Sequence, residues 1–257
     1  LSHPRTARKG NIIASLGMLI AIVSTVILGT DLDLTMIAIA MLIGTIIGAF
    51  FAIRVEMTQM PQLVAIFNGF GGGASALVAS AEFLNPGTTP TLFLIISITL
   101  SVLVGTLTFT GSFIAFGKLQ GLVTTKPVTF PGQQILNAIL AIVMIYAAYM
   151  IPTYGMTSFY TIVALSALLG ILLVIPIGGA DMPVVISLLN SYSGIAAAMT
   201  GFVLVQSNPS AGNALIICGS LVGASGMILT QIMCKGMNRS LANVIFGAVG
   251  GEVEGAS

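Results

Sequence analysis

The sequence is poor in charge, because only 6% of its 257 residues are Asp, Glu, Lys or Arg, whereas soluble domains carry about 25%. Hydrophobic residues make up 56% of the chain, and the mean hydropathy is +1.10. So few charges cannot cover a water-facing surface, which excludes an ordinary soluble globular protein and predicts a polytopic membrane protein in a lipid bilayer. The net charge of +1 gives no reason to expect a nucleic-acid partner.

Histidine and cysteine are almost absent, and this narrows the chemistry that the chain can perform. The single histidine, His3, lies in the polar segment 1–10, so no expected membrane helix carries an imidazole that switches protonation near neutral pH. Cys218 and Cys234 are separated by roughly 24 Å along one expected helix, too far for a disulfide. We interpret both as small buried hydrophobic residues.

Catalytic and cofactor signatures are also missing. We find no metal cluster, nucleophile triad, Walker loop or GxGxxG, and segment 1–10 lacks the apolar core of a signal peptide. The glycine runs 70–73 and 219–223 lie inside apolar helices, where close helix packing explains them. We therefore expect neither a metal nor a bound cofactor in this chain.

The long apolar runs predict an all-α bundle of about eight transmembrane helices, since a helix needs about 20 apolar residues to cross a bilayer. Breakers such as Asn85-Pro86-Gly87 and Asn208-Pro209 separate the runs. The expected spans are 11–29, 34–53, 60–83, 91–117, 134–152, 157–177, 182–205 and 212–235. This divides the chain into an inner polar segment at 1–10, a transmembrane domain at 11–240 and the start of a linker at 241–257.

The basic residues all fall on one side of the membrane when the chain is threaded through these spans. They are Arg5, Arg8, Lys9, Arg54, Lys118, Lys126, Lys235 and Arg239. The opposite side has the acids Asp31, Asp33 and Glu82 and no basic residue. Because basic loops stay on the cytoplasmic side, we expect both termini there. Four tyrosines at the outer hairpin of the fifth and sixth spans suit an interfacial aromatic belt.

Two stretches of the chain echo one another, 60–76 (MPQLVAIFNGFGGGASA) and 182–198 (MPVVISLLNSYSGIAAA). At a constant offset, Met-Pro matches Met-Pro and Asn68 matches Asn190. An offset of four helices preserves orientation, so the sequence predicts a parallel four-helix repeat about an axis along the membrane normal. Shared membrane-helix composition is the alternative explanation.

Two asparagines lie near the middle of the expected bilayer. Asn68 and Asn190 each lie about eight residues, roughly 12 Å, into a helix. An amide can donate and accept hydrogen bonds but cannot ionise, so it can hold a water in a proton path without storing charge. The alternative is structural, in which each Asn bonds a neighbouring helix. Nearby Ser191, Tyr192 and Ser193 favour a polar track.

Acidic residues lie at the helix ends. Asp181 precedes the seventh span and either favours the helix N-terminus as a cap or forms a gate with Arg239 or Lys235 at the same face. Glu56 resembles Asp181 in the first repeat. Glu82, at the outer end of the third span, is either a proton entry or a solvated end residue.

Several strings resemble the beta subunit of proton-translocating nicotinamide nucleotide (NAD(P)) transhydrogenase along essentially the whole chain. They are SHPRTARKGN at 2–11, VEMTQMPQLVAI at 55–66, TFTGSFIAFGKLQG at 108–121, IGGADMPVVISLLNSYSG at 177–194 and MCKGMNRS at 233–240. The resemblance implies an oxidoreductase and proton translocase in a bacterial inner membrane. Two hydrophilic domains would bind NAD(H) and NADP(H), and the membrane part would pass protons inward while hydride moves from NADH to NADP.

The resemblance also implies partners and roles for residues. The partners would be an NAD(H)-binding subunit, the chain's own NADP(H)-binding domain, further transmembrane helices and a second copy of the complex in a homodimer. The mid-membrane polar position, His in some members, matches Asn68, so a mechanism that needs an imidazole is in doubt here. Family positions also match Ser112, Asn190, Ser193 and Asp181, together with Arg239 of the MNRS string.

Three functions remain to be compared. The first is the proton channel of a transhydrogenase, with Asn68, Asn190, Ser193, Ser112 and Glu82 in the path and Asp181, Arg239 and Glu56 at an inner gate. The second is a secondary transporter of a small solute, which the lack of charges inside the helices disfavours. The third is an inert membrane anchor, against which the two mid-membrane asparagines argue.

Overall fold

A computed structural model describes residues 4–28, 33–85 and 91–246, which form α-helices and short 3-10 helices with no strand in those ranges. The chain divides into two compact units, residues 1–55 and residues 56–257. The expected all-α bundle is confirmed. His3 and Asp31 lie outside the described ranges.

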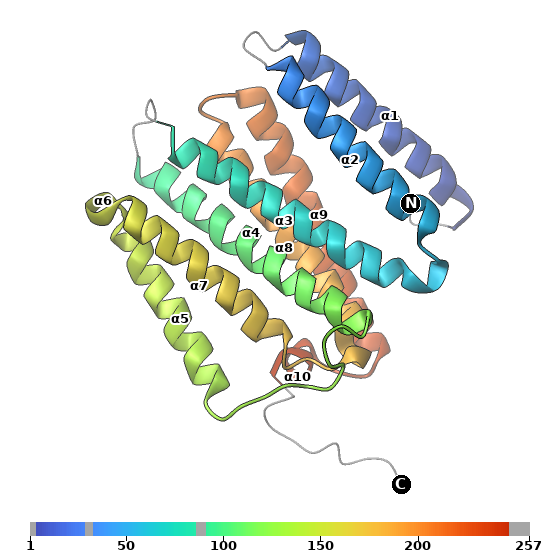
Figure 1. Ribbon diagram of the computed structural model, residues 1–257, viewed down its shortest axis with the longest axis vertical. Helices are drawn as coiled ribbons and strands as arrows, with labels where there is room; N and C mark the ends of the chain where they lie inside the picture. The colour runs from blue at the N-terminus through green and yellow to red at the C-terminus, as the bar shows by residue number, and fades with distance from the viewer. Residues whose placement is uncertain (1–3, 29–32, 86–90, 247–257) are drawn as a thin grey trace. The chain divides into compact units, whose positions relative to one another are not determined.

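The first unit is a helical hairpin of α1 (Pro4–Leu28) and α2 (Leu34–Arg54), which run side by side in opposite directions (Figure 1). Helix α1 takes in most of the segment that we expected to precede the first span. Asp33 caps α2, because its carboxylate accepts the backbone N–H groups of Thr35 and Met36 at 3.0 and 3.1 Å. No residue of α2 is buried, so its apolar surface is left for lipid or for another protein.

The second unit contains the other helices. They are α3 (Met60–Phe83), α4 (Leu92–Leu119), α5 (Gln133–Tyr149), α6 (Ile151–Tyr154), α7 (Met156–Val174), α8 (Met182–Leu204), α9 (Pro209–Gly236) and α10 (Leu241–Phe246), with 3-10 turns at Met57–Gln59 (η1) and Gly179–Asp181 (η2). Proline lies in the first turn of α3, α8 and α9, where its missing N–H costs nothing. Asn208, which we predicted only as a break between spans, caps α9 by accepting the N–H of Ala211 at 3.1 Å.

Within the described residues, six helices are long and apolar enough to cross a membrane. They are α2, α3 with its leading turn, α4, α7, α8 with its leading turn, and α9. Helix α5 is apolar but shorter. The eight expected ranges coincide with α1 to α5 and α7 to α9, shifted by a few residues at their ends. The count of eight membrane crossings itself stays a prediction.

Glycines let the helices of the second unit approach until their backbones touch. A Cβ placed on Gly72 of α3 would lie 2.8 Å from the carbonyl oxygen of Gly105 in α4. On the other pair, a Cβ on Gly194 of α8 would lie 2.5 Å from the backbone nitrogen of Gly223 in α9. No side chain fits in either place, so these glycines are required for packing.

These two contacts bear on the expected repeat. Gly72 corresponds to Gly194 in the alignment of 60–76 with 182–198, and Leu-Val-Gly at 103–105 corresponds to Leu-Val-Gly at 221–223. The two matched pairs of glycines each lie at a close backbone contact of a helical hairpin, α3 with α4 and α8 with α9. The packing agrees with an internal duplication, which remains a prediction.

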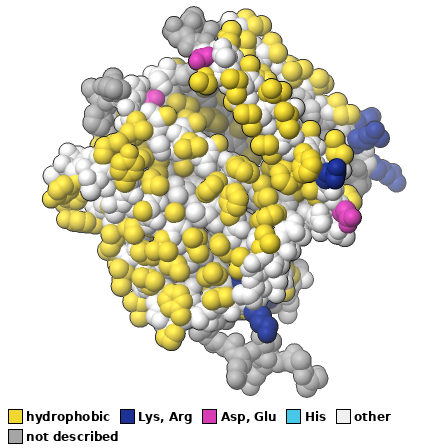
Figure 2. All heavy atoms as spheres, in the orientation of Figure 1, with side chains coloured by type: hydrophobic (Ala, Val, Ile, Leu, Met, Phe, Trp, Pro, Cys, Tyr) yellow, Lys and Arg dark blue, Asp and Glu magenta, His cyan; other side chains and the backbone are white. Residues whose placement is uncertain are grey.

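The second unit has two chemically different ends. At the basic end lie the starts of α3 and α8 and the ends of α4 and α9, with Lys118, Lys126, Lys235 and Arg239. At the opposite end lie Glu82 and the exposed Tyr146, Tyr149, Tyr154 and Tyr160. Hydrophobic side chains are spread over the visible face of the molecule, where charged side chains are few (Figure 2). This pattern suits helices that contact lipid.

Candidate functional site

A buried amide joins α3 to α8. The side chain of Asn68, which is 8% exposed, donates a hydrogen bond from Nδ2 to the carbonyl oxygen of Ile186 at 3.1 Å. Within α8, the same carbonyl also accepts the backbone N–H of Asn190, four residues later, as in any α-helix. Asn68 therefore contacts the backbone one turn before the second predicted asparagine.

A buried hydroxyl lies on α4, against the residue that follows Asn68 in α3. Ser112 of α4 is fully buried, and its Oγ has no hydrogen-bond partner among the described residues. Its Cβ lies 3.1 Å from the place that a Cβ on Gly69 would occupy. Gly69 follows Asn68, so Asn68, Ser112 and Ile186 bring α3, α4 and α8 together at one level. We call this the polar junction.

The other two predicted path residues on α8 lie apart from this hydrogen bond. Asn190 is half-buried, and its side chain makes no hydrogen bond within the described part of the chain. Ser193 is also half-buried and donates from Oγ to the backbone carbonyl of Asn190 at 2.8 Å. Both therefore extend the polar surface of α8 by about one turn without joining it to another helix.

An ion pair lies at the basic end. Arg239 donates from Nη1 to both carboxylate oxygens of Asp181, at 2.8 and 2.7 Å. The Asp181 side chain is 13% exposed and that of Arg239 is 40% exposed. Asp181 occupies the N-cap position of α8 but makes no capping hydrogen bond. Of the two sequence interpretations, the carboxylate thus takes the ion pair rather than the cap.

The two remaining predicted residues are not part of either group. Glu56 is exposed and precedes η1, and it makes no side-chain capping bond there. Glu82 is half-buried in the last turn of α3, at the end away from the ion pair. The structure records no contact of Glu56 with Asp181 or Arg239, so no recorded contact supports the predicted gate role of Glu56.

Sequence reasoning missed several buried polar residues. Ser101 and Thr200 share a 2.7 Å hydrogen bond, and both hydroxyl oxygens lie within hydrogen-bond distance of the carbonyl of Ser75, at 3.3 and 3.2 Å. On α5, Gln133 and Asn137 are buried one turn apart, and each has a side-chain oxygen without a partner in the described residues. A serine or threonine in an apolar helix gives no sequence signal of this kind, since it usually bonds its own helix.

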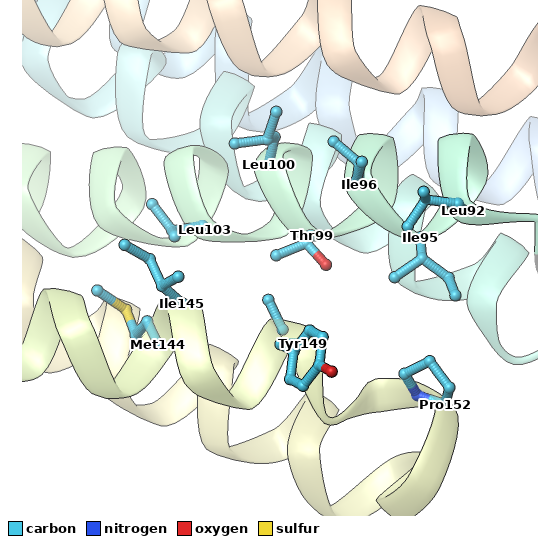
Figure 3. Close-up of a pocket in the computed structure, with 11 residues that line it drawn as sticks. Leu92, Ile95, Ile96, Thr99, Leu100, Leu103, Met144, Ile145, Tyr149 and Pro152 are labelled. Atoms are coloured by element: carbon cyan, nitrogen blue, oxygen red, sulfur yellow. The ribbon is translucent and has the colours of Figure 1, made fainter.

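A large hollow lies away from these groups. It has a volume of about 390 Å³ and lies between α4 and α5, lined by apolar side chains and by Tyr149 and Pro152 (Figure 3). The Oγ1 of Thr99, a residue that is 8% exposed, has no partner in the described residues and faces this space (Figure 3). The hollow is therefore suited to an apolar chain, and it does not include the predicted proton-path residues.

The cysteines and the glycine runs settle two minor interpretations. Cys234 is buried, but Cys218 is exposed, so our interpretation of Cys218 as a buried residue was wrong.

Gly72 and Gly223 lie inside helices against the backbone of a neighbouring helix. A dinucleotide needs glycine backbone turned toward its phosphates. These glycines face a neighbouring helix instead, so the runs do not fit NAD or NADP.

These contacts define a class of protein. The helices form a polytopic membrane bundle with a buried, uncharged polar junction, and an ion pair lies at its basic end. Asp181 precedes Ile186 by five residues, about 7–8 Å of rise along α8. Amides and hydroxyls at this depth can hold water but cannot carry a fixed charge.

Comparison with known proteins identifies the family. The family model for the NAD(P) transhydrogenase beta subunit matches residues 1–257. Two relatives called NAD(P) transhydrogenase subunit beta, both from Rhodospirillum rubrum, are each 48% identical over 260 residues, which is 98% of this chain and 55% of the relative. The chain belongs to the NAD(P) transhydrogenase beta subunit family, and it spans about half the length of these relatives.

Proposed function

We propose that this chain is the proton-translocating membrane part of an NAD(P) transhydrogenase. In the complex, inward movement of protons would drive hydride transfer from NADH to NADP in partner domains. One observation carries the proposal beyond family membership: the buried Asn68 amide bonds α8, and Ser112 of α4, whose hydroxyl has no partner among the described residues, packs against Gly69, the next residue of α3. Unpaired polar groups at such depth are costly unless water or function accounts for them.

The polar junction would hold water. Asn68 uses one N–H to bind Ile186, and an amide has a second N–H and an acceptor oxygen to offer. Ser112 can donate to one water and accept from another. Such a group passes a proton along a chain of waters without becoming charged, so the junction provides a route but no stored proton.

The ion pair would close the inner mouth of the route. Asp181 starts α8, and Arg239 lies two residues before α10, which begins at Leu241. In the proposed complex, the NADP(H)-binding domain follows this point. A change between NADP and NADPH would then pull on Arg239, separate it from Asp181 and open the inner side.

We extend the proposal to the rest of the complex, supported by the family and by the charge pattern. We place the basic end and both termini on the cytoplasmic side of a bacterial inner membrane, with Glu82 at the outer entry. The NAD(H)-binding subunit and the NADP(H)-binding domain would carry the nucleotides, and the complex would be a homodimer.

The test uses the complete complex in sealed vesicles, with proton uptake and hydride transfer measured together for Asn68→Leu and Asp181→Asn. We expect both variants to lower both signals together, because proton movement and hydride transfer are coupled. Ser225→Ala, an exposed serine that bonds its own helix at Val222, is the control and should retain both. Full coupled activity in both test variants would refute the proposal, and nucleotide-independent solute uptake would favour a secondary transporter.

A further inference from the structure

A lysine is completely buried at the basic end of the second unit. Lys118, near the end of α4, is 0% exposed. Its Nζ donates to three backbone carbonyl oxygens, at 2.6 Å to Ile175, 2.8 Å to Ile177 and 3.2 Å to Lys126. An ammonium group has three N–H donors, so all three are used.

Among the described residues, no carboxylate is recorded in an ion pair with Lys118. The ion pair that the structure records among its described residues joins Asp181 to Arg239, and it does not include Lys118. A buried ammonium costs several kcal/mol unless other groups replace water. Here the carbonyls replace it: Ile175 and Ile177 follow the last turn of α7, where helix carbonyls lack partners and the helix dipole is negative.

The three carbonyls belong to two segments that are far apart in the sequence. Lys126 lies in the loop 120–132, and the other two lie in the turn 175–179 between α7 and η2. The same segments also bond directly, since the N–H of Gly179 donates to the carbonyl of Thr125 at 2.9 Å. Lys118 therefore fastens the end of α4, the loop and the turn to one point.

The turn leads straight to the ion pair. Ile177 is four residues before Asp181, which is the last residue of η2, and Gly178 is the N-cap of that turn. We propose that Lys118 is a positioning residue of the inner gate, which holds the turn 175–179 so that Asp181 stays opposite Arg239. This inference rests on the proposed function, in which the ion pair of Asp181 and Arg239 forms the inner gate.

The geometry calls for lysine and not merely for positive charge. Three carbonyls converge on one nitrogen, and a compact ammonium with three donors matches them. The guanidinium of arginine is planar, bulkier and forked, so it cannot place one nitrogen at this point. A neutral thioether chain fills a similar volume but leaves the carbonyls without the donor.

The experiment compares four variants in the complete complex in sealed vesicles. Lys118→Met removes the ammonium, Lys118→Arg keeps the charge, and Lys118→Gln keeps a smaller neutral donor. Lys126→Met is the matched control, because it removes an exposed positive charge from the same loop while leaving the Lys126 carbonyl in place. Thermal stability, coupled hydride transfer and proton uptake are measured for each.

We expect Lys118→Met and Lys118→Arg to lower coupled transfer by about tenfold, within the usual range of energetic coupling between sites. Lys118→Gln should lose less, and Lys126→Met should keep the parental rate. If Lys118→Met does not assemble, Lys118→Gln decides by the same measurements. Parental rates in Lys118→Arg would overturn the inference, since charge alone would then suffice.

Non-additivity separates a gate from a structural brace. If Lys118 acts through Asp181, adding Lys118→Met to Asp181→Asn should cause no further loss. Losses that multiply would show independent damage and overturn the inference. If Asp181→Asn is impaired while Lys118→Met keeps the parental rate, this inference fails and the proposed function stands. Parental activity of Asp181→Asn would instead refute the gate in the proposed function itself.

Discussion

Replacing Asn68 with leucine separates a proton path from a simple helix contact. Leucine keeps the branched shape and the number of side-chain heavy atoms but removes the hydrogen bond to Ile186, which is 3.1 Å long. The Ile186 carbonyl keeps its ladder partner in α8, so no backbone acceptor is left alone in the membrane. The stability cost should therefore be small, about 0.6–1 kcal/mol, as for other buried hydrogen bonds between membrane helices.

The effect on proton movement should be much larger. If Asn68 holds a water, the variant leaves that water and the Ser112 hydroxyl without a buried partner. An unsatisfied buried polar group costs roughly 1–3 kcal/mol, which corresponds to a roughly 5- to 150-fold slower step. We therefore expect coupled hydride transfer and proton uptake to fall by at least about fivefold in a complex that still assembles.

Thr230→Val is the matched control for this experiment. Thr230 is fully buried, and its hydroxyl bonds Gly226 at 2.7 Å and Ser187 at 3.1 Å, at the interface of α8 and α9. The Thr230→Val variant loses a hydrogen bond of comparable length that does not involve Asn68. It should therefore show a similar drop in thermal stability with nearly parental transfer. Equal loss of transfer in Asn68→Leu and Thr230→Val, in proportion to stability, would refute the path.

Three further outcomes test the same picture. Arg239→Gln should lower coupled transfer as Asp181→Asn does, while stability falls by no more than about 1 kcal/mol for a partly exposed pair, as read by thermal unfolding of the complex. The exchange Asp181→Arg with Arg239→Asp should recover part of the rate, and no recovery would argue against a direct pair. Gly72→Ala should destabilise the complex by about 1–3 kcal/mol through overpacking, whereas Gly71→Ala, which meets nothing within 4 Å, should be neutral or slightly stabilising; equal melting temperatures would contradict the close approach of α3 and α4.

The helices could be predicted because their signals are local. Apolar run length, Pro in the first turn and Asn208 as a cap are all contained in short stretches of sequence. The glycine runs were also readable, since a glycine in an apolar helix usually marks a close neighbour. Their partners could be guessed only where the internal repeat supplied a second copy to compare.

The polar contacts could be predicted only in part, because most of their acceptors are backbone carbonyls. Asn68 could be found in the sequence as a polar residue in an apolar helix. Its partner could not, because the acceptor is the backbone carbonyl of Ile186 and every residue type has such a carbonyl. Lys118 was read only as a marker of membrane topology. Its burial depends on the backbone carbonyls of Lys126, Ile175 and Ile177. The side chains of these residues do not indicate that their carbonyls converge on one point.

The contacts of α8 explain how a gate and a path could work together under the proposed function. Its first residues carry Asp181, and its backbone accepts Asn68 at Ile186. One turn later, Ser191 donates to the carbonyl of Gly223 in α9 at 2.6 Å, and the glycine contact follows. Helices packed backbone to backbone have little room to slide past one another. A pull on Arg239, which follows α9, would therefore displace α8 together with the carbonyl that Asn68 binds, so the ion pair and the polar junction would change in one step.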